Sequence, residues 1–127
     1  MALQARILLL LGSFLICTAC AHPAERALEG EWWGTSVENF DDAMIASATG
    51  WARGTRLAFR DHKLIVSLPS EKSRQGTFRL TAIEDREVQL AVLDAEGVES
   101  ELRVIVDDED TIRWVLGDGR TMVLHKH

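Results

Sequence analysis

The chain has 127 residues, a length that suits one domain, and it carries 14 basic and 20 acidic side chains. Arg6 is the only charged residue among the first twenty, so residues 21–127 hold 13 basic against 20 acidic groups, a formal charge of −7. This acidic excess argues against nucleic acid as a partner and against electrostatic docking on anionic lipid.

The first twenty residues have the organisation of a secretory signal sequence. A short start with one basic residue, Arg6, precedes an apolar run over 7–16, and small residues follow over 17–21. The apolar run is about half of the roughly 20 residues that a permanent membrane helix needs. We therefore expect residues 1–20 to be a signal sequence that is removed on export.

The end of this segment fits two routes of cleavage. Thr18-Ala19-Cys20 resembles the bacterial lipobox, and this resemblance implies that Cys20 carries lipid and anchors the mature chain to a membrane. Cys17 stands where the lipobox prefers leucine, so ordinary secretion through Ala19-Cys20-Ala21 remains the alternative. Lipidation is the preferred interpretation. By either route the domain keeps no disulfide, because no cysteine follows Cys20.

The residue after the lipobox bears on location. Ala21 behind a lipidated Cys20 does not resemble the retention signal of inner-membrane lipoproteins. We therefore expect a cell-envelope lipoprotein of the outer membrane that faces the periplasm. A soluble periplasmic or secreted protein is the alternative.

Three segments are predicted before residue 55. Residues 21–27 form a short polar linker, and a first strand follows over 28–36. The stretch 39–50 breaks the strand period and predicts a short helix. Asn39 suits its N-cap, Asp41 and Asp42 suit the positive end of its dipole, and Gly50 suits its C-terminal cap.

Apolar residues alternate with polar ones from residue 56 onward, which is the period of β-strands. Strands are predicted around 56–60, 64–68, 77–82, 88–92, 101–106, 112–116 and 122–124. With the first strand and the short turns between them, they make an all-β, eight-stranded antiparallel up-and-down meander. Curling this sheet into a barrel buries its one apolar face and removes exposed edges, and a two-sheet sandwich is the alternative.

Gly30-Glu31-Trp32 resembles the Gly-x-Trp signature that opens the first strand of lipocalin and other calycin barrels. The downstream strand rhythm is similar too, so residues 28–127 are expected to form one lipocalin-like domain. The resemblance implies a barrel that is closed at one end and often open at the other to an apolar ligand. It also implies that Trp32 packs across the closed end under a basic side chain from a late strand, Arg113 or Arg120.

Apolar side chains supply the candidate ligand site. If the helix over 39–50 is a lid, it would line the barrel mouth with Trp33 and Trp51, above the inward-facing residues of the strands. The alternatives are a helix that plugs the barrel end and bulky side chains that fill the interior completely. The candidate ligand-binding residues are Trp33, Phe40, Met44, Trp51, Phe59, Phe78 and Trp114.

The motifs that carry catalysis or bind metals are not found in the sequence. It holds no Gly-x-Ser-x-Gly, no His-Glu-x-x-His and no phosphate loop, and its paired carboxylates fall in predicted turns. His125 and His127 share a strand face, but two ligands without a third are weak support for a metal site. We therefore expect no enzyme activity, no metal and no cofactor.

Three functional hypotheses remain. The preferred one is an exported, lipid-anchored envelope protein whose non-catalytic barrel binds a small hydrophobic molecule. The second is a packed barrel that acts as an interaction module for another envelope protein, as an inhibitor or an assembly accessory, with no small ligand. The third is a small envelope hydrolase or isomerase, which would need a polar pocket with paired histidine and carboxylate that the predicted strand faces do not offer.

Overall fold

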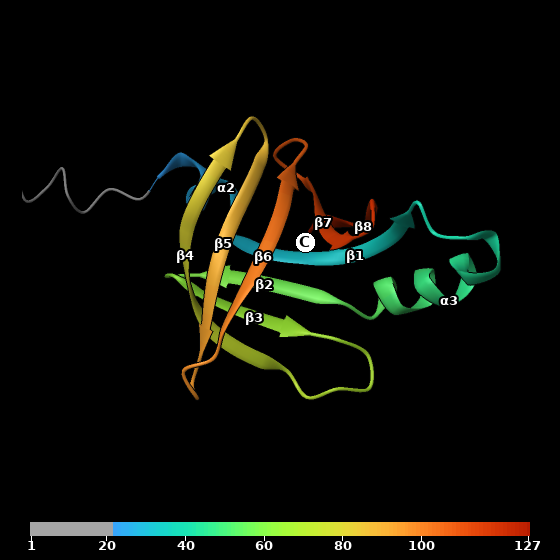
Figure 1. The fold of residues 1–127 in the computed structure, drawn as a ribbon, viewed down its shortest axis with the longest axis horizontal. Helices are drawn as coiled ribbons and strands as arrows, with labels where there is room; N and C mark the ends of the chain where they lie inside the picture. Colours follow the sequence, from blue (N-terminus) through green and yellow to red (C-terminus); the bar gives the residue numbers. More distant parts are fainter. Residues whose placement is uncertain (1–21) are drawn as a thin grey trace, which may run out of the picture.

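The computed structural model describes residues 22–127, which fold into a closed antiparallel barrel (Figure 1). No helix in this part of the chain is long and apolar enough to cross a membrane. The predicted signal sequence and the lipidation site Cys20 lie outside the described residues.

Helix α2 (Pro23–Leu28) precedes the barrel, and α3 (Asp42–Arg53) connects its first two strands. The strands are β1 (Gly30–Glu38), β2 (Arg56–Arg60), β3 (Lys63–Ser67), β4 (Arg74–Glu84), β5 (Glu87–Asp94), β6 (Glu99–Val106), β7 (Thr111–Gly117) and β8 (Arg120–Lys126).

Each strand pairs with its neighbours in sequence, and β1 closes the barrel by pairing with β8 from Trp32↔Lys126 to Glu38↔Thr121. This topology confirms the predicted eight-stranded antiparallel up-and-down meander, with a short helix between the first two strands. The pairing of the first strand with the last also shows that the sheet forms a closed barrel and not the alternative two-sheet sandwich. Closure gives the first and last strands of the meander a partner, so neither is left as an exposed edge.

One hydrophobic core lies inside the barrel, because the apolar residue of each alternating pair faces inward. The core residues on the strands are almost completely buried, and other inward-facing apolar residues, such as Val66 and Val92, pack partly buried against them. The buried strand residues are Trp32, Leu57, Phe59, Leu64, Phe78, Val88, Leu90, Leu102, Val104, Ile112, Met122 and Leu124.

Residues 23–28 form a helix where the sequence predicts a polar linker over 21–27. Pro23 lies in its first turn, and the Nδ1 atom of His22 accepts a hydrogen bond of 3.1 Å from the Ala24 N–H. Leu28 is fully buried, and its carbonyl accepts a hydrogen bond of 2.8 Å from Trp32 Nε1. A helix of one or two turns is not stable alone, so these tertiary contacts hold α2 in place. The first strand consequently starts at Gly30 rather than at residue 28.

Helix α3 begins and ends three residues later than the predicted span of 39–50. Asn39 does not cap it: this residue has a φ of +63°, and its side-chain amide donates a hydrogen bond of 2.7 Å to the Gly119 carbonyl. Asp41 takes the N-cap position, Gly50 lies inside the helix, and Gly54 caps the C-terminus. The prediction was wrong here because Asn39 bonds to the β7–β8 hairpin, a contact that no local pattern shows.

Candidate functional site

Helix α2 and Trp32 close one end of the barrel. The Trp32 ring is fully buried, and the Nζ atom of Lys126 lies 5.3 Å from its centroid. Neither arginine named from the lipocalin resemblance covers this ring. Arg113 binds Asp107 instead, and the Arg120 guanidinium lies 5.1 Å from the Phe40 ring. The β1–β8 register explains the difference, because it pairs Trp32 directly with Lys126.

The other end of the barrel holds a pocket of about 260 Å³. Its floor is formed by inward-facing apolar residues of β3, β5, β6 and β7, and its rim by polar residues at the ends of β4, β5 and β6. The β3–β4 and β5–β6 turns border it, which places it at the end of the barrel opposite α2. The floor residues are Leu64, Val66, Val92, Leu102 and Trp114, and the polar rim residues are Arg74, Gln75, Asp94, Ser100 and Glu101.

Helix α3 lies at this open end (Figure 1) but only its last turns contact the barrel. Ala52 is fully buried, and its carbonyl lies so close to Gly34 of β1 that no side chain fits there. The Trp51 ring lies 6.4 Å from the Trp114 ring at an angle of 33°, so an aromatic pair joins the helix to the pocket floor. Met44 and Ile45, at the other end of the helix, are 45% and 43% exposed. The helix therefore neither plugs the barrel nor covers its mouth completely.

The remaining candidate ligand-binding residues lie elsewhere. Phe59 and Phe78 pack edge to face in the core, with ring centroids 5.4 Å apart. Trp33 lies on the outer wall, where the Arg56 guanidinium (4.1 Å) and the His127 ring (4.1 Å, 9° between planes) contact it. Strand alternation sends Trp33 outward because Trp32 faces inward. Of the seven residues named from the sequence, Trp114 lines the pocket, and Trp51 packs against its ring.

The wall beside the pocket is split between β6 and β7. These strands pair only over Val104–Val106 and Ile112–Trp114, at the end near α2. From Leu102 toward the β5–β6 turn, β6 keeps its pairing with β5 but has no partner on its other side among the described residues. Sequence patterns missed this split and the polar rim, because strand alternation shows which side chains face inward but not where two strands separate.

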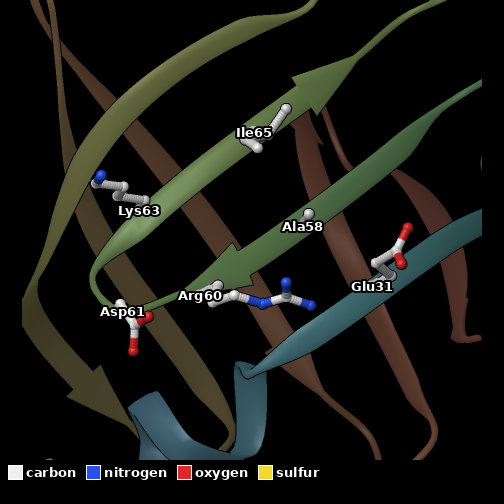
Figure 2. A pocket seen from close by; sticks show the side chains of 6 residues that line it. All are labelled: Glu31, Ala58, Arg60, Asp61, Lys63 and Ile65. Carbon is white, nitrogen blue, oxygen red and sulfur yellow. The ribbon is translucent and has the colours of Figure 1, made fainter.

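The outer wall of β1, β2 and β3 carries a hollow of about 430 Å³ (Figure 2). Figure 2 shows Glu31 on β1, Arg60 at the end of β2 and Lys63 at the start of β3, with Asp61 in the turn between them. Charges of both signs line this open surface, and their side chains are exposed. It lacks the apolar enclosure of the barrel mouth, so the mouth is the better candidate for binding an apolar molecule.

An ion pair with two hydrogen bonds lies on the outer wall. Arg113 donates two hydrogen bonds to Asp107, Nε to Oδ2 at 2.8 Å and Nη2 to Oδ1 at 2.9 Å. These bonds, aided by the charges of Arg113 and Arg86, hold the pKa of the Asp107 carboxyl below its usual value. The pair joins the β6–β7 turn to β7, away from the pocket, so it supports the fold rather than binding chemistry. Within residues 22–127, no three His, Cys, Asp or Glu side chains are arranged to hold a metal ion.

In comparisons with known proteins, no family model, no curated protein and no solved structure matches the chain. The eight-stranded antiparallel barrel is compatible with a lipocalin-like fold, and the architecture alone carries that likeness.

Proposed function

We propose that this protein is an exported, lipid-anchored envelope protein whose non-catalytic barrel binds a small apolar molecule at its open end. The observation that carries the proposal is the pocket floor of Leu64, Val66, Val92, Leu102 and Trp114. An apolar floor with a few polar groups at its rim is the usual construction of a small-molecule site.

The size of the pocket narrows the class of ligand. Its volume of about 260 Å³ lies just below the roughly 300–1,000 Å³ of sites for drug-sized molecules. The buried core behind it leaves no deeper channel, since Phe59, Leu90 and Ile112 are fully buried. The ligand is therefore a small apolar molecule or one apolar end of a longer one.

The position of α2 supports an orientation for an anchored protein. The described chain begins at His22, next to the closed end of the barrel, and the pocket is at the opposite end (Figure 1). If Cys20 carries lipid, only one residue lies between it and His22. The closed end then faces the membrane, and the mouth opens toward the aqueous compartment.

Uptake of a neutral hydrophobic dye tests the binding. We would titrate N-phenyl-1-naphthylamine into the mature chain carrying Cys20→Ser, which removes the lipid. One saturable site is expected, and Val66→Phe should weaken the dye affinity about tenfold or more by filling the pocket. Ile83→Phe is the matched control, because Ile83 is an exposed β4 residue outside the pocket. Equal dye affinity in the wild type and Val66→Phe, or no uptake by the wild type, would overturn the proposal.

Metabolic labelling tests the anchor. In a bacterial host fed radiolabelled palmitate, the full chain should incorporate label and the Cys20→Ser chain should not. Ile83→Phe is the control, because Ile83 is an exposed β4 residue far from the lipobox and its substitution should not change labelling. Label that persists in Cys20→Ser, or that is absent from the wild type, would contradict lipidation and favour ordinary secretion.

An interaction module is the second candidate, and the exposed apolar side chains of Met44 and Ile45 favour it. In that case the dye would not bind in the pocket. Ile45→Lys would instead weaken cross-linking of the protein to a partner in the envelope. Cross-linking that is unchanged by Ile45→Lys would count against this candidate.

A further inference from the structure

The split between β6 and β7 leaves one strand edge of the barrel unpaired. Strand β6 pairs with β5 from Glu99 to Ile105 but with β7 only from Val104 to Val106. Residues 99–103 of β6 therefore have a free side, and residues 115–117 of β7 face it across the split. A strand with a free side presents backbone N–H and C=O groups that can pair with another chain.

The register shows which backbone groups point into the split. Asp94 donates a backbone hydrogen bond of 3.0 Å to Val98 at the β5–β6 turn, and in an antiparallel pair every second residue makes such bonds. Even-numbered residues of β6 therefore bond to β5, and their side chains, such as Leu102, face the barrel interior. The backbone groups of Glu99, Glu101 and Arg103 point toward β7, where no strand of the described chain meets them.

The ligand pocket lies directly behind this free edge. Leu102 on β6 and Trp114 on β7 both line it, together with Ser100 and Glu101 from the edge itself. A strand laid along residues 99–103 would have side chains that alternate between two environments. Those opposite Ser100 and Leu102 would point into the apolar pocket, and those opposite Glu101 would point to solvent beside its carboxylate.

The outer side of the edge is mainly acidic, and its one basic residue, Arg103, bonds to Glu87 on β5. The segment 94–101 contains Asp94, Glu96, Glu99 and Glu101 and no basic residue. Arg79 lies 3.8 Å from Glu99, and Asp94 accepts backbone hydrogen bonds from Glu96 and Val98 within its own turn. Neither Glu96 nor Glu101 forms an ion pair within residues 22–127. Their negative charges are therefore free to meet basic side chains of a partner.

We propose that an extended segment of a partner protein, in which basic and apolar residues alternate, adds as an antiparallel strand to the free edge of β6. Its backbone pairs with Glu99, Glu101 and Arg103, its basic side chains meet Glu96 and Glu101, and one apolar side chain enters the pocket. The last of these contacts rests on the proposed function, because it uses the same pocket as the small-molecule site. The backbone pairing and the charge contacts do not depend on it. This is strand addition, a known mode of peptide recognition.

A fluorescently labelled nine-residue peptide of alternating lysine and valine is the probe, used with the mature chain carrying Cys20→Ser. Two N-methylated versions separate strand pairing from general attraction. Methyl groups on the lysine nitrogens remove the N–H donors that face β6, whereas methyl groups on the valine nitrogens leave those donors in place. Each lost backbone bond is worth about 1 kcal/mol, so lysine methylation should weaken binding by about tenfold or more. Valine methylation should change it much less.

Variants of the protein test the edge and the charges separately. Glu101→Pro removes an N–H that points into the split but removes no hydrogen bond to β5. It should therefore weaken peptide binding and leave the fold intact. Glu101→Lys should also lower the peptide affinity, by about tenfold, because it replaces an attractive charge with a repulsive one. Glu109→Lys makes the same charge change in the β6–β7 turn at the far end of β6, and peptide affinity should stay unchanged.

The outcomes distinguish this inference from the proposed function. If the peptide binds equally well in all methylated forms, or Glu101→Pro has no effect, strand addition is overturned. If the dye binds and the peptide does not, the inference fails while the small-molecule site stands, and the acidic residues then serve only to keep other strands away. If the protein with the unaltered edge dimerises through β6, the edge fits a second copy of this chain and the heterologous partner is excluded. If the peptide binds and Val66→Phe leaves the peptide affinity unchanged, no side chain of the peptide enters the pocket, and that contact is overturned.

Discussion

The two ends of the barrel are built from similar parts with different results. Each end carries a helix and tryptophan, but α2 buries Leu28 and bonds to Trp32, whereas α3 buries only Ala52. The six-residue helix therefore closes its end, and the twelve-residue helix leaves a pocket beside it. The comparison teaches that closure depends on how much apolar surface a helix buries, not on how long it is.

The tertiary contacts at the two ends differ in the same way. Trp32 is fully buried with its Nε1 hydrogen bonded and Lys126 above its ring. Trp51 and Trp114 form a tilted pair that is only partly buried. Rigid packing at one end and partial packing at the other is the arrangement expected when stability and binding are separated in one small domain.

The largest expected effect is at the closed end. Trp32→Ala should lower the free energy of unfolding by about 3–5 kcal/mol, because it leaves a cavity beneath Lys126 and removes the hydrogen bond to Leu28. Urea unfolding followed by circular dichroism measures this. Trp114→Ala at the open end should cost clearly less, since the pocket already leaves one side of that ring without contacts. Equal losses would contradict the difference in packing between the two ends.

The contact between α3 and the barrel should give the next largest effect. A Cβ atom at Gly34 would collide with the Ala52 carbonyl, so Gly34→Ala should cost about 1–3 kcal/mol and displace the helix. The matched control is Gly50→Ala inside the same helix, where no atom lies within 4 Å of the added Cβ. That substitution should stabilise the protein by roughly 0.5–1 kcal/mol. Thermal unfolding of both variants checks the pair, and a stabilising Gly34→Ala would show that α3 does not pack as described.

The Asp107–Arg113 pair near the closed end should make stability depend on pH. The folded-state pKa of Asp107 lies below the unfolded value of about 3.9, mainly because Arg113 bonds to the ionised carboxyl. Its contribution is therefore fully present above that unfolded value and is lost as the pH falls through the folded-state pKa. Asp107→Asn should cost about 1 kcal/mol at pH 7, because both side chains are partly exposed.

The same variant also supplies the control for this prediction. The stability of Asp107→Asn should converge with that of the wild type in acid, where Asp107 is protonated. Urea unfolding at a series of pH values measures both curves. A constant gap between the curves down to the lowest pH would show that ionisation of Asp107 is not the cause.

The smallest effect is expected at the exposed end of α3. Ile45→Ser should change the free energy of unfolding by no more than about 0.5 kcal/mol, because the side chain is 43% exposed. Denaturation measures this directly. A loss of stability as large as that of Gly34→Ala would mean that the first turns of the helix are packed in solution. The two ends of the barrel would then differ less in packing.

Much of the fold could be predicted from local patterns, and the site only in part. Alternation over the strands predicts that Leu57, Leu102 and Leu124 face inward. The predicted lid over 39–50 makes Trp51 a candidate site residue, and the inward strand face makes Trp114 one. Alternation did not show that Trp33 stacks on His127, that Lys126 rather than Arg113 or Arg120 covers Trp32, or that Asn39 bonds to Gly119. Each of these contacts joins residues far apart in the chain, and strand register decides which of them meet.

The sequence by itself therefore determined the eight strands, their antiparallel order and the inward face of each, because a period of two is a local property of the backbone. Only the tertiary structure decided which end is closed, where the pocket lies and where β6 loses its partner. These features depend on the relative stagger and length of neighbouring strands and on how well each helix packs against the barrel. They result from contacts summed over the whole molecule, and no single segment encodes them.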